Sequence, residues 1–414
     1  FKVNSGEYKV MGLAPYGVPK YKELIIKNLM DLKEDGSFRL DMSYFNYATG
    51  LTMTNDKFSN IFGEKVRSNE SKLNQFHMDI AASIQEVTEE IMLRITRSIS
   101  NEYKIKNLCL AGGVALNCVA NGKILRDGFF ENIWIQPAAG DAGGALGAAL
   151  LLWYDEFKNK REIINKDSMK GSYLGPSYKH QTIEEDLKTI GAHYELFDDE
   201  KLIEFSADAL DKGKIIGWFQ GRMEFGPRAL GNRSILADPT SAKMQKNLNL
   251  KVKFRESFRP FAPSILRENL EEWFCLNVDS PYMQLVSNIN KDKAIKMTDE
   301  EKKLFGIKKL NIPRSCIPAV THVDYSARIQ TVHKETNPRF HALITKFNKL
   351  KKCPILVNTS FNVRGEPIVN SPLDAYKCFM GTNIDILIIE NFVLYKDKQE
   401  KKIDHDYKNR YELD

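Results

Sequence analysis

The segments NLCLAGGVALN (residues 107–117) and IWIQPAAGDAGGALG (residues 133–147) decide the fold class. In each segment a short apolar run ends in a glycine turn, and a second apolar run follows the turn. An apolar run bounded by glycine is typical of a buried strand, and the sequences beyond the turns predict helices over 114–125 and 143–153. A strand, a glycine turn and a helix, repeated in this order, predict an α/β domain.

Apolar periodicity outlines the elements on either side of these segments. In residues 79–99, branched apolar side chains recur at spacings of three and four, at Ile80, Ile84, Val87, Ile91 and Ile95. This spacing predicts one apolar face of a long helix. Later apolar runs predict a helix at 202–210 and strands at 214–219, 354–358 and 384–389. The sequence from 155 to 181 is polar and has no period, and we place a domain boundary there.

Composition and charge restrict the classes of protein. The 414 residues are 43% hydrophobic and 28% charged, which excludes a disordered, collagen-like or coiled-coil chain. Lys and Arg (60) exceed Asp and Glu (54), and the net charge of +6 is not concentrated in a basic block. Because duplex DNA binding depends on a basic stripe, we expect no nucleic-acid partner, whereas small anionic substrates are compatible with the charge.

Cysteines, the longest apolar run and the two ends complete the general picture. Six dispersed cysteines without a C-x-x-C pair predict reduced thiols in a cytoplasmic protein. The apolar run Ala145–Tyr154 has about half of the ~20 residues that a membrane span needs, so we expect a buried helix and no membrane partner. The chain begins at Phe1, close to the dense motif MGLAPYG at 11–17, and we expect an N-terminal truncation. The charged end of the chain is expected to fray.

The two glycine turns are candidate ligand sites. Gly112 and Gly113 allow a sharp turn and a close approach of the backbone to a ligand, and the helix that follows presents N–H groups that suit phosphate. A tight turn without a ligand explains this pair equally well. Asp141 lies where α/β folds place ligand-binding residues and could hold a metal or a ribose hydroxyl, or it could cap the next helix. Two such turns in one domain favour a nucleotide.

The segment GWFQGRMEFGPRALGNRS, residues 217–234, concentrates arginine and glycine. Three arginines lie among four glycines, which is typical of a site that binds anionic oxygens bidentately. A solvated basic loop is the alternative, but it does not explain the interleaved aromatic residues. The next basic segment, KVKFRESFR at 251–259, would place Lys251, Lys253 and Arg255 on one face if it is extended.

Two later segments carry polar side chains that suit a phosphate or a planar amide. The sequence NTSFNVRGEP, residues 358–367, follows a predicted strand and combines amides, hydroxyls and an arginine. An Asx or ST turn is a credible alternative for its first two residues. The sequence THVD at 321–324, with Arg328 after it, predicts either a further oxyanion contact or a surface loop.

Taken together, the motifs resemble those of the carbamoyltransferases of the nodulation-protein-U and cephalosporin-hydroxymethyl type, which include the tobramycin and novobiocin-class O-carbamoyltransferases. The resemblance covers nearly the whole chain and rests on six segments in order, at 11–17, 111–117, 140–145, 224–234, 253–256 and 358–362. It implies an α/β (overall α+β) protein. Residues 1–171 would be the back part of an actin-like (ASKHA) domain, 172–400 a YrdC-like domain, and 401–414 a charged tail.

The resemblance also implies the reaction. Carbamoyl phosphate and ATP, with Mg²⁺, would form carbamoyl adenylate in the YrdC-like domain with loss of phosphate and pyrophosphate. The carbamoyl group would then pass to a hydroxyl of a small molecule, such as a sugar, an antibiotic or another natural product, in the actin-like domain. That domain would hold an iron ion (Fe²⁺).

The resemblance assigns roles to residues of this chain. The adenylate would be bound and formed by Arg228, Lys253, Arg259, Arg328, Ser360 and Asn362, the first three as catalytic residues. From their chemistry and position we add as substrate-binding residues Arg222, Arg233, Arg255, Asn358 and Arg364. The nucleotide-binding turns of the first domain would be formed by Gly112, Gly113, Asn117, Gly143 and Gly144. Asp141 would be a metal ligand.

One departure and two alternatives qualify this interpretation. Members of the family carry a metal-binding histidine pair in the first part of the actin-like domain, but the first histidine here is His77. We therefore expect adenylate formation to survive and the metal site to be incomplete. The alternatives are a tRNA threonylcarbamoyl-type enzyme, which should carry a broad basic surface, and a non-catalytic nucleotide-binding fragment.

Overall fold

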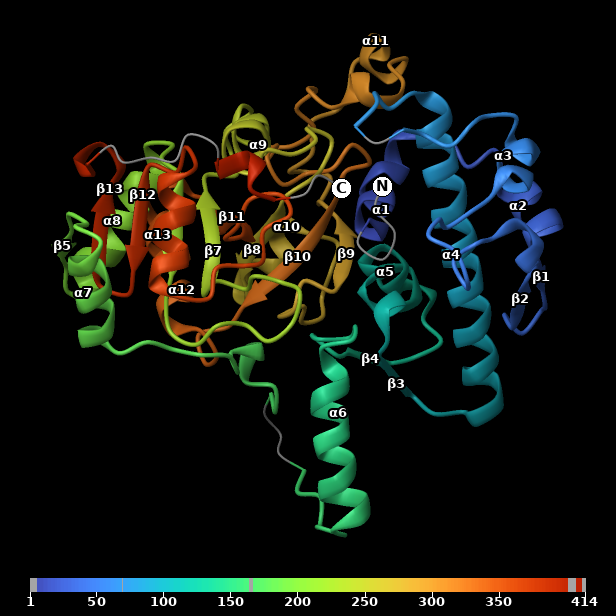
Figure 1. Ribbon diagram of the computed structural model, residues 1–414, viewed down its shortest axis with the longest axis horizontal. Helices are drawn as coiled ribbons and strands as arrows, with labels where there is room; N and C mark the ends of the chain where they lie inside the picture. The colour runs from blue at the N-terminus through green and yellow to red at the C-terminus, as the bar shows by residue number, and fades with distance from the viewer. Residues whose placement is uncertain (1–5, 69, 164–166, 401–406, 412–414) are drawn as a thin grey trace.

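A nine-stranded mixed sheet forms the centre of the C-terminal part of the computed structural model, which describes residues 6–68, 70–163, 167–400 and 407–411 (Figure 1). Its strands in chain order are β5 (Glu195–Leu196), β6 (Ile216–Phe219), β7 (Arg233–Ala237), β8 (Ala262–Leu266), β9 (Leu285–Asn288), β10 (Ser326–Val332), β11 (Ile355–Ser360), β12 (Ile386–Ile389) and β13 (Phe392–Tyr395). Their order in space is β5-β13-β12-β6-β7-β11-β8-β10-β9. The pairs β12–β6 and β10–β8 are parallel and the others antiparallel.

The predicted strands of this sheet are confirmed, because apolar side chains cover both of its faces. Every residue of β6, β7, β8 and β12 is buried, which explains why the predicted strands β6 and β12 read as continuous apolar runs. The main flanking helices are α7 (His180–Thr189), α8 (Asp199–Asp211), α12 (Pro338–Lys351) and α13 (Pro372–Met380). Helix α12 packs against α8 and against strands β8 and β11, while α13 packs against α7, β6 and β12. The short helices α9 (Met244–Asn247), α10 (Leu270–Trp273) and α11 (Asp299–Lys302) lie in connections.

The N-terminal part is organised around the long helix α4 (Gln75–Tyr103), which confirms the helix predicted at 79–99. Its first turn is closed by a capping box between Asn74 and His77. Val87 and Ile91 are buried against α2 (Lys22–Leu29) and α3 (Asp56–Phe62), whereas Ile84 is exposed. Helix α1 (Glu7–Leu13) and the hairpin of β1 (Met30–Leu32) and β2 (Phe38–Leu40) complete this part.

The two glycine turns follow a small parallel sheet of β3 (Asn107–Leu110) and β4 (Asn132–Ile135). After the first turn a 3-10 turn precedes α5 (Cys118–Asp127), so the α-helix begins four residues later than predicted. After the second turn comes α6 (Gly143–Leu151), which continues as a π turn to Glu156. The N–H of Gly112 donates to the carbonyl of Ala139 at 2.8 Å, so the two turns lie side by side.

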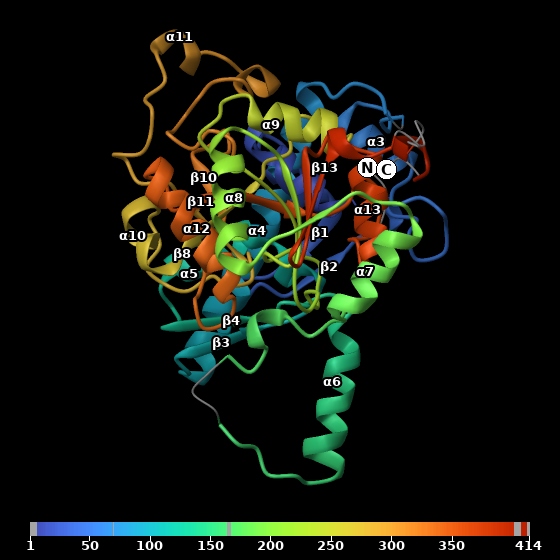
Figure 2. The ribbon, with the colours of Figure 1, turned by 90° about the vertical axis from the view of Figure 1, so that its left-hand side faces the viewer.

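The predicted burial is wrong for α6 and holds only in part for β3 and β4, where Leu108 and Ile135 are buried. Helix α6 projects away from the rest of the protein (Figures 1 and 2), and Leu151 and Trp153 are 61% and 53% exposed. Cys109 in β3 and Trp134 in β4 are exposed as well. An apolar run predicts that a surface should be covered, but the described residues supply no element that packs over this face.

Two further predictions are corrected. Residues 248–252 form a π turn and not an extended segment, because Leu248 and Val252 pack into the core on one side of the turn; Lys251 is therefore exposed and Lys253 buried. The end of the chain is not frayed at 407–411, where Tyr407 is buried and its hydroxyl donates to Glu366. The remainder of the predicted tail, 401–406 and 412–414, lies outside the described residues. Among the described helices, none is long and apolar enough to span a membrane.

Candidate functional site

A cavity of about 860 Å³ lies between the N-terminal part and the large sheet. One wall is formed by α1 and the start of α5, including Tyr8, Met11 and Cys118. The opposite wall comes from the segments that precede β7, β8 and β10 and from the end of β11. Figure 1 shows α1 and α5 beside β9 and β10, at the edge of the large sheet. The cavity is therefore built by segments that are far apart in the sequence.

Polar contacts tie the two walls together. The Tyr16 hydroxyl donates to the carbonyl of Phe258 at 3.0 Å. The guanidinium of Arg364 donates to both carboxylate oxygens of Glu70, at 3.1 and 2.6 Å. These contacts join the first 70 residues to the later segments, so the cavity depends on both parts of the chain.

Most of the predicted substrate-binding residues line this one cavity. They are Arg228, Lys253, Arg255, Arg259, Arg328, Asn358, Ser360, Asn362 and Arg364. Four separate segments supply them, and the sheet explains how they meet, because β7, β11, β8 and β10 are neighbours in it. The residues of the basic and amide-rich motifs therefore form a single cationic site.

Lys253 is the buried centre of the site. Its ammonium donates to the carbonyls of Ser360 and Asn362 at 2.8 and 2.7 Å and to the Asn362 side-chain oxygen at 2.5 Å. Burial, followed by the nearby charge of Arg255, holds the Lys253 pKa well below its usual value. Four oxygens in all, with the Ser360 hydroxyl at 3.3 Å, fix the loop after β11 against the basic segment.

Arg228 and Arg328 are cations without partners among the described residues. Neither guanidinium makes a hydrogen bond or ion pair there, and the Nε atom of each is buried and unpaired. Burial, followed by the charge of Arg328, lowers the pKa of Arg228 to about 9. Because two unpaired cations in one cavity disfavour each other, this arrangement suits a bound anion.

The other cavity cations are held in place by neighbouring side chains. The Nε of Arg255 donates to the Asn249 side chain at 2.7 Å, and its guanidinium lies 4.7 Å from the ring centre of Phe261. Arg259 lies 4.7 Å from the ring centre of Tyr8. Burial and the charge of Arg259 lower the Arg255 pKa well below its usual value. These contacts orient the cations before a ligand arrives.

The side-chain amide of Asn358 is held in place by neighbouring side chains. Its Nδ2 donates to Ser264 and Gln330 at 3.0 and 2.9 Å, whereas its Oδ1 is buried and has no partner in the described part of the chain. Arg364 also lines the cavity, but its guanidinium is engaged by Glu70. Asn358 therefore offers an acceptor to a ligand, and Arg364 mainly joins the walls.

Two predicted arginines lie outside the cavity as the described residues define it. Arg222 is exposed and donates to the carbonyl of Leu174 at 3.0 Å. Arg233 is buried, donates to the carbonyls of Gln220 and Gly221 at 2.9 and 3.2 Å, and stacks on Phe219. Both of its terminal nitrogens have backbone partners and only its buried Nε has none among the described residues, so the geometry gives Arg233 a structural role.

The sequence interpretation missed the contribution of the N-terminal segment. Tyr8, Met11, Gly12 and Pro15 line the cavity, although the motif at 11–17 had served only to indicate a family. The dense glycine, proline and aromatic content of this motif was the feature of the sequence that could have indicated a place in the site. In the THVD segment, His322 is buried and lines the cavity together with Asp324; an oxyanion contact from this segment stays a prediction.

The glycine turns form a separate, open surface. A Cβ on Gly113 or Gly144 would meet nothing within 4 Å, whereas one on Gly143 would lie 2.2 Å from the carbonyl oxygen of Ala138. Gly112 has a φ of +95°, which favours glycine. The Asn117 side chain caps α5 by accepting from the N–H of Ala120 at 3.1 Å. Gly113 and Gly144 therefore leave room for a ligand, while the other members of the set have structural roles.

The predicted metal site is not formed by the described residues. Asp141 is exposed, and the residue that caps α6 is Ala142. Within the described residues, no group of three His, Cys, Asp or Glu side chains is placed to hold a metal ion. Iron binding at Asp141 therefore stays a prediction, and no step of the reaction is assigned to a metal in this domain.

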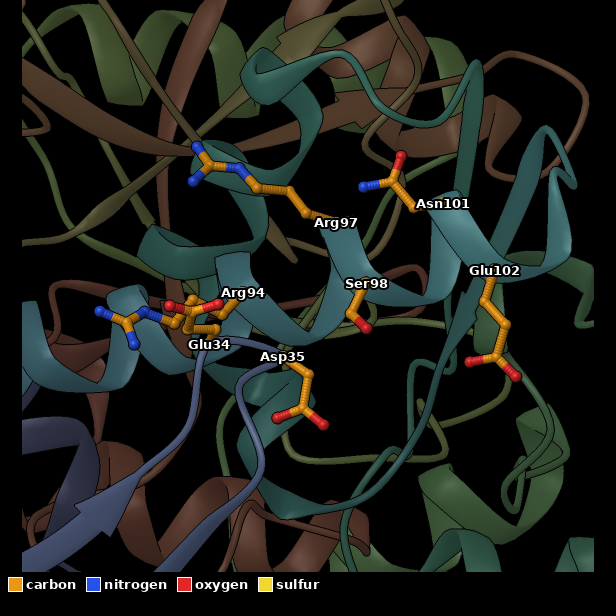
Figure 3. A pocket seen from close by; sticks show the side chains of 7 residues that line it. All are labelled: Glu34, Asp35, Arg94, Arg97, Ser98, Asn101 and Glu102. Carbon is orange, nitrogen blue, oxygen red and sulfur yellow. The ribbon is translucent and has the colours of Figure 1, made fainter.

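A second hollow, of about 560 Å³, lies where the turn between β1 and β2 meets α4 (Figure 3). Both arginines that line it are already paired. Arg97 forms two hydrogen bonds to Asp127 at 2.7 and 2.6 Å, and Arg94 forms an ion pair with Glu90 at 2.7 Å. The arginines of this hollow are therefore engaged by carboxylates, and we assign the hollow no function.

Two family models match the chain in succession. The carbamoyltransferase N-terminus matches residues 1–150, and the carbamoyltransferase C-terminus matches residues 207–396. The chain belongs to the carbamoyltransferase family. Membership confirms the predicted family and identifies the enzyme class as a transferase.

Named relatives agree with this family. The protein sll1178 of Synechocystis is 59% identical over 417 residues, covering 100% of this chain and 68% of its own length. Nodulation protein NolO of Bradyrhizobium diazoefficiens is 39% identical, with 94% of this chain and 66% of its own length covered. The 3'-hydroxymethylcephem-O-carbamoyltransferase of Streptomyces clavuligerus is 32% identical over 68% of this chain and 47% of its own length. Because this carbamoyltransferase chain spans only about half to two thirds of these relatives, the activity of a whole protein is a proposal.

Among solved structures, the full-length HypF crystal structure in its phosphate- and nucleotide-bound form is similar to this carbamoyltransferase over 73% of the chain and 45% of HypF. The sequence identity is 12% and the TM-score 0.30. We draw no argument from a similarity of this size.

Proposed function

We propose that this chain uses carbamoyl phosphate and ATP to form carbamoyl adenylate in the cationic cavity. The observation that carries the proposal is the pair of guanidinium groups of Arg228 and Arg328, which are half-buried in the cavity wall and have no partner among the described residues, beside the anchored ammonium of Lys253. Acyl-phosphate and phosphoryl transfer depend mainly on positioning and on cations that stabilise developing negative charge. A cavity whose lining includes Lys253 and six arginines (Arg228, Arg255, Arg259, Arg328, Arg364 and Arg410) suits such chemistry.

The proposed reaction balances with one water molecule. Water cleaves carbamoyl phosphate to carbamate and inorganic phosphate, and a carbamate oxygen then attacks the α-phosphorus of ATP. Pyrophosphate leaves and carries the electrons of the broken P–O bond. Arg228, Arg328 and Arg259 would neutralise the phosphate oxygens, and Lys253 would hold the loop of Ser360 and Asn362 against the carbamoyl group. Mg²⁺ would enter with ATP.

We propose that the carbamoyl group next passes to a hydroxyl of a small molecule. The acceptor hydroxyl attacks the carbamoyl carbon, loses its proton, and AMP leaves. The names of the relatives support this acceptor class, since one is an O-carbamoyltransferase of a hydroxymethyl group. In the proposed division, 1–171 is actin-like and 172–400 YrdC-like, and the open turns with Gly113 and Gly144 would take part in this second step. An iron ion at Asp141 and a cytoplasmic location stay predictions.

The proposal is tested by measuring phosphate and pyrophosphate release from carbamoyl phosphate and MgATP without an acceptor. We expect release that depends on carbamoyl phosphate in the unmodified chain and that falls at least about 100-fold in Arg228→Ala, by analogy with the loss of one preorganised donor. Arg222→Ala is the matched control, because Arg222 is exposed and outside the cavity. No release from folded protein, or equal loss in both variants, would reject the proposal.

A further inference from the structure

A histidine whose ring has one free nitrogen lines the cavity. His322 is 8% exposed and lies in the turn that leads into β10, the strand that carries Arg328. Its Nε2 is 3.2 Å from the carbonyl oxygen of Gly12. Its Nδ1 is buried and has no hydrogen-bond partner among the described residues. Nε2 therefore makes a structural contact with Gly12, whereas Nδ1 has no partner among the described residues.

The Gly12 contact determines which nitrogen carries the proton. A carbonyl oxygen only accepts hydrogen bonds, so Nε2 is the protonated nitrogen and donates to it. Burial lowers the pKa of His322 below its usual value, which favours the neutral ring. Nδ1 is then a lone-pair acceptor inside the cavity wall.

A second acceptor lies next to this nitrogen. The Asp324 carboxylate is 3.7 Å from Nδ1, too far for a hydrogen bond. The same Asp324 oxygen accepts from the N–H and the hydroxyl of Ser326 at 3.1 and 2.6 Å, so it is fixed in place. His322 Nδ1 is therefore an unsatisfied acceptor beside a fixed carboxylate, in a cavity whose charged lining groups are mostly cations.

We propose that His322 Nδ1, together with Asp324, accepts a hydrogen bond from an N–H or O–H group of the substrate and thereby contributes to substrate specificity. The inference rests on the proposed function for the identity of the substrates. Carbamoyl phosphate offers its amino group as the donor, and ATP offers its ribose hydroxyls. The cations of the cavity can bind the phosphate oxygens of either molecule, but they cannot recognise a donor.

Two variants separate this role from the contact with Gly12. In His322→Gln the amide nitrogen can take the place of Nε2 and donate to Gly12, but no acceptor remains at Nδ1. In His322→Asn a polar group remains near Nδ1, but the bond to Gly12 is lost. Thermal unfolding identifies the variant that loses the structural contact, and we expect it to be His322→Asn.

The functional readout is discrimination between matched substrates. Acetyl phosphate replaces the amino group of carbamoyl phosphate with a methyl group, and 2'-deoxy-ATP and 3'-deoxy-ATP each lack one ribose hydroxyl. A site that hydrogen-bonds a substrate donor rejects the analogue without it by several orders of magnitude. We expect His322→Gln to reduce one of these discrimination ratios in kcat/KM at least about tenfold, and the ratio that falls identifies the donor.

Binding measurements keep the inference separate from the proposed reaction. Calorimetric titration of carbamoyl phosphate, acetyl phosphate, ATP and the two deoxy analogues needs no turnover. Preferential binding that is lost in His322→Gln upholds the acceptor role even if the unmodified chain releases no phosphate. Unchanged ratios in His322→Gln overturn it, as does an equal fall in His322→Asn, which would show that the contact with Gly12 is what matters.

Discussion

Replacing Arg228 with methionine should make the protein more stable and inactive at once. Arg228 makes no hydrogen bond or ion pair to the described residues, and Arg328 adds a repulsive charge nearby. The charge of Arg228 therefore lowers the free energy of unfolding, and a bound anion would offset this loss. Methionine keeps most of the side-chain volume and removes the charge.

The magnitude follows from the pKa of Arg228, which burial and the charge of Arg328 lower to about 9. Each pKa unit corresponds to about 1.4 kcal/mol, which sets an upper bound of about 5 kcal/mol on the cost of the charge. Because the cavity is open to water, we expect a gain of about 1–2 kcal/mol in the free energy of unfolding. For a chain of this length that corresponds to about 1–2 °C in Tm.

The pH dependence of this gain has a defined sign. The folded state binds the Arg228 proton more weakly than the unfolded state, so the full cost is present below about pH 9. Above about pH 9 the folded state begins to lose the proton, and the cost falls as the pH rises further. The difference in stability between Arg228→Met and the unmodified chain should therefore be largest near pH 7 and narrow above pH 9.

The assay is urea unfolding of both proteins at pH 7 and pH 9.5, with and without 10 mM phosphate (about the concentration that saturates a weak anion site). Phosphate should stabilise the unmodified chain and leave Arg228→Met unchanged. Arg233→Met is the control, because Arg233 donates to several buried carbonyls and its loss should destabilise the fold. An Arg228→Met protein less stable than the unmodified chain would refute the reasoning.

Three further predictions concern other contacts of the site. Lys253→Met should reduce phosphate release at least about 100-fold and lower the free energy of unfolding by about 2–3 kcal/mol in urea titrations, because buried oxygens lose their donor. Glu70→Gln should lower the free energy of unfolding by about 0.5 kcal/mol at pH 7, since the hydrogen bond to Arg364 lowers the Glu70 pKa. The contribution of Glu70 is present above the ordinary pKa of a glutamate and is lost as the pH falls through the lowered pKa of the folded state. The urea unfolding curves of Glu70→Gln and the unmodified chain should therefore converge in acid. Gly143→Ala should destabilise the fold by at least about 2 kcal/mol because its Cβ would meet a backbone carbonyl, whereas Gly144→Ala should unfold like the unmodified chain and lose only transfer to the acceptor, measured as carbamoylated product.

The sequence predicted the strands of the large sheet well, for a physical reason. Strands such as β6 and β12 are buried on both faces, so their apolar runs are continuous and end at turn residues. The long helix α4 was equally predictable, since apolar residues recur along one of its faces. Local signals of this kind do not depend on which distant segment is the neighbour.

What the sequence did not predict depends on tertiary contacts. Arg228 and Arg233 are five residues apart in one motif, yet one is unpaired in the cavity and the other is bound to backbone carbonyls. Met11 lines the same cavity from the other end of the chain. For α6, hydrophobicity predicted burial, but the described part of the chain does not cover that helix.

Identification of the nucleotide product tests the central claim most directly. The chain is incubated with carbamoyl phosphate and MgATP labelled in the α-phosphate, without an acceptor, and the nucleotides are separated. Attack at the α-phosphorus predicts carbamoyl adenylate and its hydrolysis product AMP, formed with pyrophosphate only when carbamoyl phosphate is present, and abolished in Arg228→Met but not in Arg222→Met. Formation of ADP, or of AMP that does not depend on carbamoyl phosphate, would contradict the assignment of the cavity as an adenylate-forming site.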